Sequence, residues 1–479
     1  MTMSCALRAL HDGHRAVSPC LPGSLFRVCG TLGAMRIQSL RLVHIGPFED
    51  TKIEFPAGTN PDLADVYLLV GQNGCGKTTA LHLLAALLAP DVASALRVQR
   101  RFNGEASFAV ATGDGANARW VLGSPPSSEV LGLSAQPPSS WVPVVGASQS
   151  VAMEWQTWYG RFSGQQHGGG WQRNGPPIPW AAFAYAGERS VNEVNVRTIQ
   201  ELDTAPLGNS LGFHHAAVSQ HLAQWVANQE FKKLKALQAQ QEGRAKAIAE
   251  SVHRIEAAVS EVIGTEFSFY TEVEGTEVRA KLNGTVVELG LLPAGVQSIM
   301  SWIGDLLMRL DRVEWADNRA VHERAFLLLL DEIDVHLHPA WQRKLLGVVQ
   351  KAFPKAQIIA STHSPFLVAS LADGAVIELK LDPKGRSIAQ PPLMAPLEKS
   401  YSSTMRQLFG IDSDFDLETE TLFRQFQAKI EQVLRGDGSA QEELDRRSRE
   451  LKARGEEIAQ LVQFELNQLQ RRRPRPSGS

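Results

Sequence analysis

The stretch VYLLVGQNGCGKTTALHLLAALLA, residues 66–89, restricts the fold of this chain more than any other part of its 479 residues. It opens with a short apolar run, which is typical of a strand buried on both faces of a parallel sheet. A glycine-rich loop follows, and then a run of apolar residues suited to a helix. The order strand, glycine loop and helix, with the pattern G-x-x-x-x-G-K-[ST], predicts a phosphate-binding loop.

The glycine loop, residues 71–79, supplies groups suited to a nucleotide. Its glycines let successive backbone N–H groups point at phosphate oxygens, and the N-terminus of the following helix adds positive potential. The Lys77 ammonium can reach the β- and γ-phosphates, and the Thr78 hydroxyl can hold Mg²⁺. We therefore predict ATP and Mg²⁺ as cofactors. The predicted nucleotide-binding residues of the loop are Gly71, Asn73, Gly74, Cys75, Gly76, Lys77, Thr78 and Thr79.

A second apolar run ends in acids, in FLLLLDEIDVHLHP, residues 326–339. A phosphate-binding loop needs a neighbouring strand that offers an aspartate to Mg²⁺ beside a group that orients water. We predict that Asp331 is the magnesium-side acid and that Glu332 is the general base or water-positioning residue. His336 and His338 would diverge by about 200° on a helix and would alternate sides in an extended loop. A transition-metal site is therefore not favoured here.

The overall charge and hydropathy limit the class of protein. The chain has 48 Lys and Arg against 51 Asp and Glu, a net charge of −3, so any contact with nucleic acid is expected to be local. No apolar run approaches the ~18–20 residues that span a bilayer. These features predict a cytoplasmic protein that does not enter a membrane.

Four cysteines form no CxxC pair and no zinc spacing, which fits a reducing compartment. They are Cys5, Cys20, Cys29 and Cys75. Cys75 lies in the glycine loop, where positive potential would favour its thiolate. A buried and inert thiol is the alternative at this position.

Two helices that form an arm are predicted between the two motifs. Five apolar residues step by 4, 3, 4 and 3 positions, which is the seam of a helix with one partner helix. Gly243 is expected to separate the two helices, and the alternative is a helix that lies on the domain core. The seam residues are Ile248, Val252, Ile255, Val259 and Val262.

Three stretches carry a family resemblance: DEIDVHLHPAWQ (331–342), QIIASTHSPF (357–366) and MRIQSLRLVHIGPFEDTKIEF (35–55). They resemble the ABC-type ATPase heads of the RecF/SMC/OLD group. Within that group the chain is most similar to bacterial anti-phage "AAA family" ATPases of the Septu PtuA and retron-associated kinds. The resemblance covers roughly residues 35–110 and 285–395.

The resemblance assigns roles to individual residues. It places Asp331 and Glu332 in the Walker B pair, and His363 where a catalytic histidine contacts the γ-phosphate. Gly295 falls in the signature that opens a helix and meets the ATP of a partner subunit, although Pro293 stands where the family has a serine. The backbone N–H groups and the helix dipole could still act there.

Other family features match less well. AYAGER resembles a turn near the nucleotide, which makes Tyr185 and Arg189 candidates beside ATP. Relatives of the OLD type append a nuclease that needs a glutamate and an Asp-x-Asp pair. Glu378, Asp412 and Asp414 imitate that pattern without its glycine or its apolar strand, so no nuclease is predicted in this chain.

The resemblance also implies the fold and the organisation of the chain. The expected fold is α/β, a P-loop NTPase of ABC-ATPase head type with a mixed sheet and an antiparallel β subdomain. Residues 1–34 lack the apolar core of a secretory signal, and regular alternation begins only at Met35. The predicted units are a poorly ordered extension (1–34), an ABC-type ATPase domain (35–395) with a β and loop insertion (about 101–178) and a helical arm (about 214–264), and a C-terminal helical region with a basic tail (396–479).

The implied function is that of an ATPase that forms a dimer or a higher oligomer around ATP. Such an ATPase would regulate a separate effector, plausibly a nuclease, in anti-phage defence. The alternative is a RecF/SMC-like ATPase of DNA repair or chromosome maintenance. A transporter ATPase subunit is less favoured, because the signature is degraded.

Overall fold

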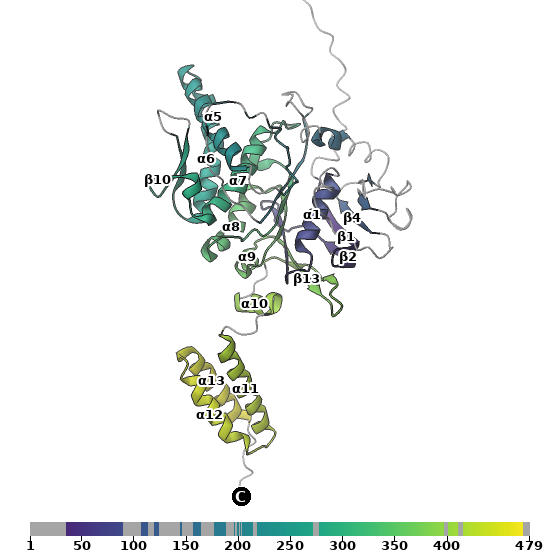
Figure 1. Cartoon of the computed structure of the whole chain (residues 1–479), viewed down its shortest axis with the longest axis vertical. Helices are drawn as coiled ribbons and strands as arrows, with labels where there is room; N and C mark the ends of the chain where they lie inside the picture. Colours follow the sequence, from purple (N-terminus) through teal and green to yellow (C-terminus); the bar gives the residue numbers. More distant parts are fainter. Residues whose placement is uncertain are drawn as a thin grey trace, which may run out of the picture.

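Figure 1 shows the computed structural model, with a sheet-centred head and a helical C-terminal end. The structure describes residues 35–89, 107–113, 119–123, 144–145, 157–163, 177–187, 196, 199–200, 202, 204–213, 218–271, 277–396, 401–410 and 415–472. Residues 1–34, the tail after residue 472, Arg189, Asp412 and Asp414 lie outside the described residues. Much of the predicted insertion over 101–178 lies outside them as well.

A central mixed sheet forms the frame of the head, in the order β14-β13-β3-β12-β11-β7, with β15 also paired to β13. The five strands from β13 to β7 are parallel to one another, and β14 and β15 are antiparallel to β13. The apolar runs predicted as buried strands are confirmed in β3 and β11. The bounds are β3 (Asp65–Gly71), β7 (Ala181–Tyr185), β11 (Phe326–Leu330), β12 (Gln357–Ser361), β13 (Gly374–Leu381), β14 (Ser387–Ala389) and β15 (Leu393–Met394).

An antiparallel sheet forms the predicted β subdomain, in the order β2-β1-β4-β5-β6. Helix α1 (Lys77–Leu88) packs between this sheet and the central sheet (Figure 1), so that most of its side chains are buried. The two sheets therefore share one core through α1. The strands are β1 (Ile37–Ile45), β2 (Phe48–Glu54), β4 (Phe108–Gly113), β5 (Arg119–Gly123) and β6 (Val144–Val145).

Helices and a small third sheet cover the opposite side of the central sheet (Figure 1). The third sheet has the order β10-β9-β8 and is antiparallel. Two short 3-10 helices, η1 (Leu289–Leu291) and η2 (Val321–Glu323), lie in the connections. The remaining elements here are α5 (Val218–Gln238), α6 (Glu242–Ile263), β8 (Phe267–Thr271), β9 (Val278–Leu282), β10 (Thr285–Glu288), α7 (Ala294–Arg312), α8 (Pro339–Ala352) and α9 (Pro365–Ser370).

The predicted arm is the antiparallel pair α5 and α6, and its details need two corrections. The seam on α6 does not serve a single partner helix: Ile255, Val259 and Val262 are fully buried in the main core, where α6 also packs against α7 and α8. The alternative of a helix on the core thus holds for this half of α6. The break between the helices falls at Gln240, whose φ is 55°, and Gly243 lies inside α6.

Side chains of α6 cover the outer edge of β8. The Phe269 backbone N–H donates to the Glu256 carboxylate at 2.8 Å, and the Phe267 N–H donates to the Ser260 hydroxyl at 2.9 Å. The same hydroxyl donates to the Phe267 carbonyl at 3.2 Å. An edge strand normally presents such groups to any chain that can pair with them. Here α6 takes the place of a neighbouring strand.

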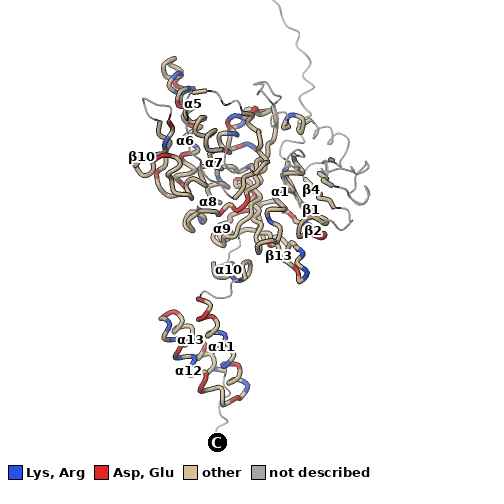
Figure 2. The backbone as a smooth tube through the Cα atoms, in the orientation of Figure 1, with Lys and Arg blue, Asp and Glu red and all other residues tan. Residues whose placement is uncertain are grey.

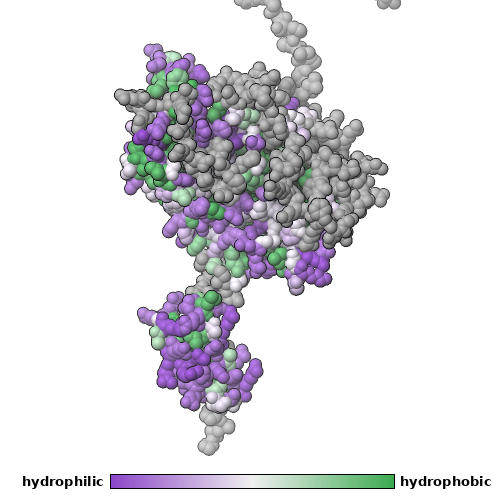
Figure 3. Space-filling view, in the orientation of Figure 1, coloured by the Kyte–Doolittle hydropathy of each residue, from purple (hydrophilic) through white to green (hydrophobic). Residues whose placement is uncertain are grey.

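The C-terminal helices follow α10 (Tyr401–Phe409) as a three-helix bundle with its own core: α11 (Leu417–Leu434), α12 (Ala440–Lys452) and α13 (Glu456–Arg472). One face of α11 is apolar and buried, with Phe426 fully buried. Charges of both signs cover the bundle, and its surface is largely hydrophilic (Figures 2 and 3). Among the described residues, no helix combines the length and apolarity that a bilayer crossing needs.

Because the bundle core shares no residue with the main core, its stability can be changed separately. We predict that Phe426→Ala destabilises the bundle by ~3–5 kcal/mol, the usual cost of deleting a fully buried aromatic ring, and leaves nucleotide affinity unchanged. Denaturant unfolding followed by circular dichroism, with calorimetric titration of nucleotide, checks both. Leu417→Ala is the control, since Leu417 is 83% exposed. Impaired nucleotide binding in Phe426→Ala would contradict separate cores.

Candidate active site

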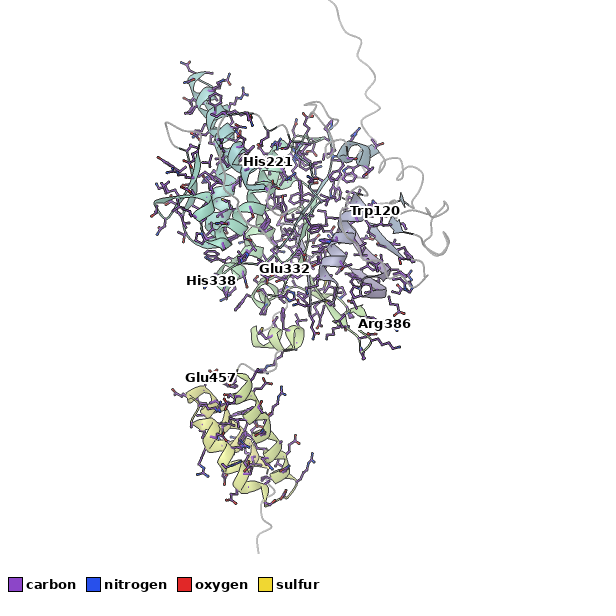
Figure 4. All side chains as sticks on the ribbon, in the orientation of Figure 1. Trp120, His221, Glu332, His338, Arg386 and Glu457 are labelled. Carbon is purple, nitrogen blue, oxygen red and sulfur yellow. The ribbon has the colours of Figure 1, made fainter. Side chains whose placement is uncertain are left out.

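A cavity of about 660 Å³ lies where the glycine loop, the acids after β11 and the residues after β12 converge. Strand β12 stands between β3 and β11, so the carboxyl ends of these parallel strands meet at one edge of the sheet. Figure 4 places Glu332 at the centre of the head, between its two halves. The described residues that line the cavity are Gly46, Pro47, Asn73, Gly74, Gly76, Lys77, Thr78, Thr79, Glu332, Ser361 and His363.

The glycine loop has the backbone shape that the motif predicts. Gly71 and Gly76 have φ values of 146° and 95°, which other residues rarely adopt. A Cβ at Gly71 would also lie 2.2 Å from the Leu379 carbonyl oxygen, and one at Gly76 would lie 2.6 Å from the Phe48 ring. Both positions therefore require glycine. Lys77 is 7% exposed and donates to the carbonyls of the loop itself, at 2.9 Å to Gly71 and 3.2 Å to Gln72.

The expectation of a reactive thiolate at Cys75 is not supported. The Cys75 side chain is fully buried beneath the loop. Burial raises the pKa of the Cys75 thiol, and this outweighs the opposing influence of the Lys77 ammonium, whose nitrogen is 3.9 Å from the sulfur. The inert-thiol alternative describes this residue. Its backbone carbonyl accepts a hydrogen bond from the Ser387 hydroxyl at 2.7 Å, which ties the loop to β14.

The Asp331 side chain connects the ends of β3, β11 and β12 through hydrogen bonds. Its Oδ1 atom accepts from the Thr78 hydroxyl at 3.1 Å and from the Ser361 hydroxyl at 2.5 Å. The side chain is 8% exposed, so these donors offset the cost of burying its charge. The predicted metal ligands Thr78 and Asp331 are thus adjacent, and hydroxyl and carboxylate oxygens are the donors that Mg²⁺ prefers. This donor set suits the predicted ion.

Glu332 extends into the cavity from an unusual backbone conformation. Its φ is 44°, in the left-handed region that non-glycine residues rarely occupy. Its N–H donates to the Ser361 hydroxyl at 2.7 Å, and its carbonyl accepts from the Val335 N–H at 3.2 Å. The carboxylate of Glu332 is exposed, in contrast to that of Asp331. Strain held by hydrogen bonds of this kind is characteristic of functional positions.

His363 lines the same cavity, as the resemblance implied. Burial lowers the pKa of His363, and the nearby Lys77 ammonium lowers it further, against the opposite influence of Asp334 and the two acids after β11. The imidazole is therefore neutral at pH 7 and can donate one N–H. The preceding Thr362 hydroxyl donates to Asp334 at 2.7 Å, which holds this loop against the loop that follows β11.

Two predicted residues are not part of this cavity. The Tyr185 hydroxyl donates to the buried Asp305 carboxylate at 2.7 Å, on the side of α7, so its expected place beside the nucleotide is wrong. Gly295 is buried at the start of α7, and a Cβ there would lie 2.7 Å from the His336 carbonyl oxygen. Its role toward a partner's ATP stays a prediction. His338 caps α8, where its Nδ1 accepts from the Ala340 N–H at 3.2 Å.

Sequence reasoning missed three residues of the site. Gly46 and Pro47, in the turn between β1 and β2, form part of the cavity wall, and Ser361 supports both acids. The turn was recognisable as Gly-Pro, but nothing in the sequence places it against the glycine loop. Ser361 directly precedes the Thr-His pair, so its position at the end of β12 was the available signal.

The phosphate-binding loop, the acid pair and the strand order between them define a P-loop nucleotide-binding domain, with the mixed sheet and antiparallel subdomain expected from the sequence. Two family models match within this domain: one described as "AAA domain, putative AbiEii toxin, Type IV TA system" over residues 283–369, and one described as "AAA domain" over residues 35–89. The predicted fold class is confirmed, and the matches to AAA domains and to a retron ATPase agree with the prediction of an ATPase.

Curated relatives share short segments with the chain. The Septu protein PtuA of Bacillus thuringiensis is 50% identical over 56 residues, which are 12% of this chain and 14% of PtuA. The retron Vc95 "probable ATPase" of Vibrio cholerae is 26% identical over 152 residues, 32% of this chain and 28% of the relative. The matched segments thus span less than a third of these relatives. The chain is related in sequence to PtuA and to retron ATPases, which confirms the stated resemblance.

Solved structures of SMC head domains are similar to the chain at low sequence identity. An SMC head bound to the C-winged helix domain of ScpA has a TM-score of 0.43 and 12% identity, covering 75% of this chain and 98% of that one. The SMC head domain from Thermotoga maritima has a TM-score of 0.40 and 12% identity, covering 74% and 98%.

Lys77 carries the clearest prediction for this site. Its side chain is the only Lys or Arg among the described residues that line the cavity, and charge-assisted hydrogen bonds to phosphate are the stronger ones. We predict that Lys77→Ala abolishes ATP binding and leaves the fold intact, measured by calorimetric titration and circular dichroism. Lys384→Ala, which changes an exposed lysine, is the control. Unchanged ATP affinity in Lys77→Ala would refute the assignment of the loop.

Proposed function

We propose that this chain binds Mg-ATP in the cavity and hydrolyses it slowly, and that copies of the chain associate around the bound nucleotide. The observation that carries the proposal is that Lys77 and Glu332 line one cavity, while Asp331 accepts a hydrogen bond from Thr78 in the wall of that cavity. A cation for phosphate, an acid for the metal and an acid for water are the groups that phosphoryl transfer requires.

Each side chain has a distinct part in the proposed reaction. The Lys77 ammonium gives up its hydrogen bonds to the Gly71 and Gln72 carbonyls and binds the β- and γ-phosphates of ATP. Thr78 and Asp331 would hold Mg²⁺, which neutralises phosphate charge when bound. Glu332 orients a water molecule and accepts its proton during attack on the γ-phosphate. The neutral His363 donates its N–H to a γ-phosphate oxygen.

The start of α7 and the cavity lie apart within one copy of the chain. Among the described lining residues of the cavity there is none from the signature region that precedes α7. That region presents Leu291, which is 73% exposed, close to the start of α7. The N-terminus of α7 suits a contact with a second copy, whose bound nucleotide would receive the helix dipole. Pro293 offers no hydroxyl, so this contact is expected to be loose and turnover slow.

A separate effector is the proposed output of the ATPase. The sequence relation to a Septu protein and to retron ATPases supports a role in anti-phage defence, and the effector is plausibly a nuclease. Among the described parts of the chain, the hydrophilic C-terminal bundle is the proposed contact for this effector. The position of the bundle would depend on whether two heads are joined by ATP.

The Glu332→Gln variant tests both the chemistry and the association. The substitution keeps the size and hydrogen bonding of the side chain but removes the proton acceptor, which is typically worth ~10²–10⁴ in rate. We predict that ATP binding persists, hydrolysis falls by this factor, and the variant accumulates as a dimer or larger assembly with Mg-ATP. Phosphate release and size-exclusion chromatography with light scattering measure the two effects.

Glu457→Gln on the C-terminal bundle is the matched control and should behave as the wild type (Figure 4). Hydrolysis at the wild-type rate in Glu332→Gln would remove Glu332 from its proposed role. Lost hydrolysis without any change in mass would keep the chemistry and refute association through ATP.

The defence role is tested in cells. We predict that the gene, expressed with its genomic neighbours in a bacterial host, lowers the efficiency of plating of at least one phage. Lys77→Ala should abolish this protection, because nucleotide binding is lost, while Lys384→Ala should retain it. Equal plating with the wild type and with Lys77→Ala across a broad phage panel would refute an ATP-dependent defence function.

A further inference from the structure

Gly187, in the turn after β7, lies directly against the side chain of Glu332. A Cβ built at Gly187 would be 2.8 Å from the Cβ of Glu332 and 2.8 Å from its Oε2 atom, closer than real Cβ atoms approach other atoms. Gly187 is buried, whereas the Glu332 carboxylate reaches the cavity. The turn after β7 therefore forms one wall of the space in which the Glu332 side chain can lie.

The turn is fixed to the strand that carries Glu332. The N–H of Asp331 donates to the Tyr185 carbonyl at 2.9 Å, which continues the parallel pairing of β11 with β7. Backbone pairing thus holds the end of β7 beside the acid pair. On its other side, Glu332 is held by the hydrogen bond from its N–H to Ser361.

The end of β7 is also anchored from behind, by the ring of Tyr185. The Tyr185 hydroxyl donates to Oδ2 of Asp305 at 2.7 Å, and Asp305 is fully buried in α7. Arg309 donates to the same oxygen at 2.5 Å and to the carbonyls of Pro206 and Gly208 at 2.8 and 2.9 Å. Charge-assisted hydrogen bonds of this kind are short and strong, so the ring has little freedom.

We propose that Gly187 and Tyr185 are positioning residues for Glu332, an inference that rests on the proposed role of Glu332 in hydrolysis. Gly187 leaves the space that the carboxylate needs, and the hydrogen bond from Tyr185 to Asp305 keeps the turn at the required distance. Neither residue is among the described residues that line the cavity. Their effect on the reaction passes through the orientation of a single carboxylate, for which displacements of about 1 Å can cost ~10² in rate.

Gly187→Ala tests the proposal, because the added methyl group must displace the Glu332 side chain. We predict that kcat falls by about 10- to 100-fold, with the dissociation constant for Mg-ATP, measured by calorimetry, changed less than about threefold. Gly347→Ala is the matched control, since a Cβ at this helical glycine meets nothing within 4 Å. It should leave kcat and affinity unchanged.

A double-mutant cycle with Glu332→Gln identifies the route of the effect. If Gly187 acts through Glu332, the alanine substitution should have no further effect on the residual hydrolysis of Glu332→Gln. An equal fall in kcat when Gly187→Ala is introduced into the wild type and into Glu332→Gln would overturn the proposal. An unchanged kcat in Gly187→Ala, or a loss of ATP affinity as large as the loss of kcat, would overturn it as well. If Glu332→Gln itself hydrolyses at the wild-type rate, the proposed function has failed, which is a different result.

Tyr185→Phe provides a second variant that adds no bulk. It removes the hydroxyl that Asp305 accepts from and leaves the ring in place, so it should fold even if Gly187→Ala does not. We expect a lower kcat with unchanged ATP affinity, and a smaller loss than in Gly187→Ala. An unchanged kcat would show that the contact with Asp305 does not position Glu332 and would overturn that part of the proposal.

Discussion

The rest of the site depends on the hydrogen bonds that the buried Asp331 carboxylate accepts. A charge that is 8% exposed is costly without hydrogen-bond donors, and its donors come from the ends of two other segments, Thr78 after β3 and Ser361 at the end of β12. These three segments are adjacent only when the strand order β3-β12-β11 has formed. The site and the central sheet are therefore specified together, and a change in the register of one strand would disrupt both.

The sequence was informative where a short apolar run led into polar residues. VYLLV and FLLLL could be interpreted as buried strands, and the chemistry at their ends followed from the rule that parallel strands bring their carboxyl ends together. The position of Ser361 could not be derived in this way. It depends on β12 inserting between β3 and β11, a fact of strand order that no local pattern contains.

Tertiary packing explains the predictions that were wrong. Positive potential at the glycine loop favoured a thiolate at Cys75, but the side chain turns under the loop, where burial dominates. Tyr185 lies at the end of a strand that reaches the site, but alternation along β7 directs its ring to α7. Helix α6 packs against α5, α7 and α8, and the periodicity of its apolar residues alone cannot show how many helices they contact.

The covered edge of β8 restricts how the third sheet could grow. Glu256 and Ser260 accept hydrogen bonds from backbone N–H groups of β8 that an incoming strand would otherwise pair with. Strand β10 forms the opposite edge of the three-stranded sheet. A sheet that can accept a strand on one side only cannot propagate. Two copies paired through β10 would form a six-stranded sheet with both ends covered, so polymerisation by strand addition would stop at the dimer.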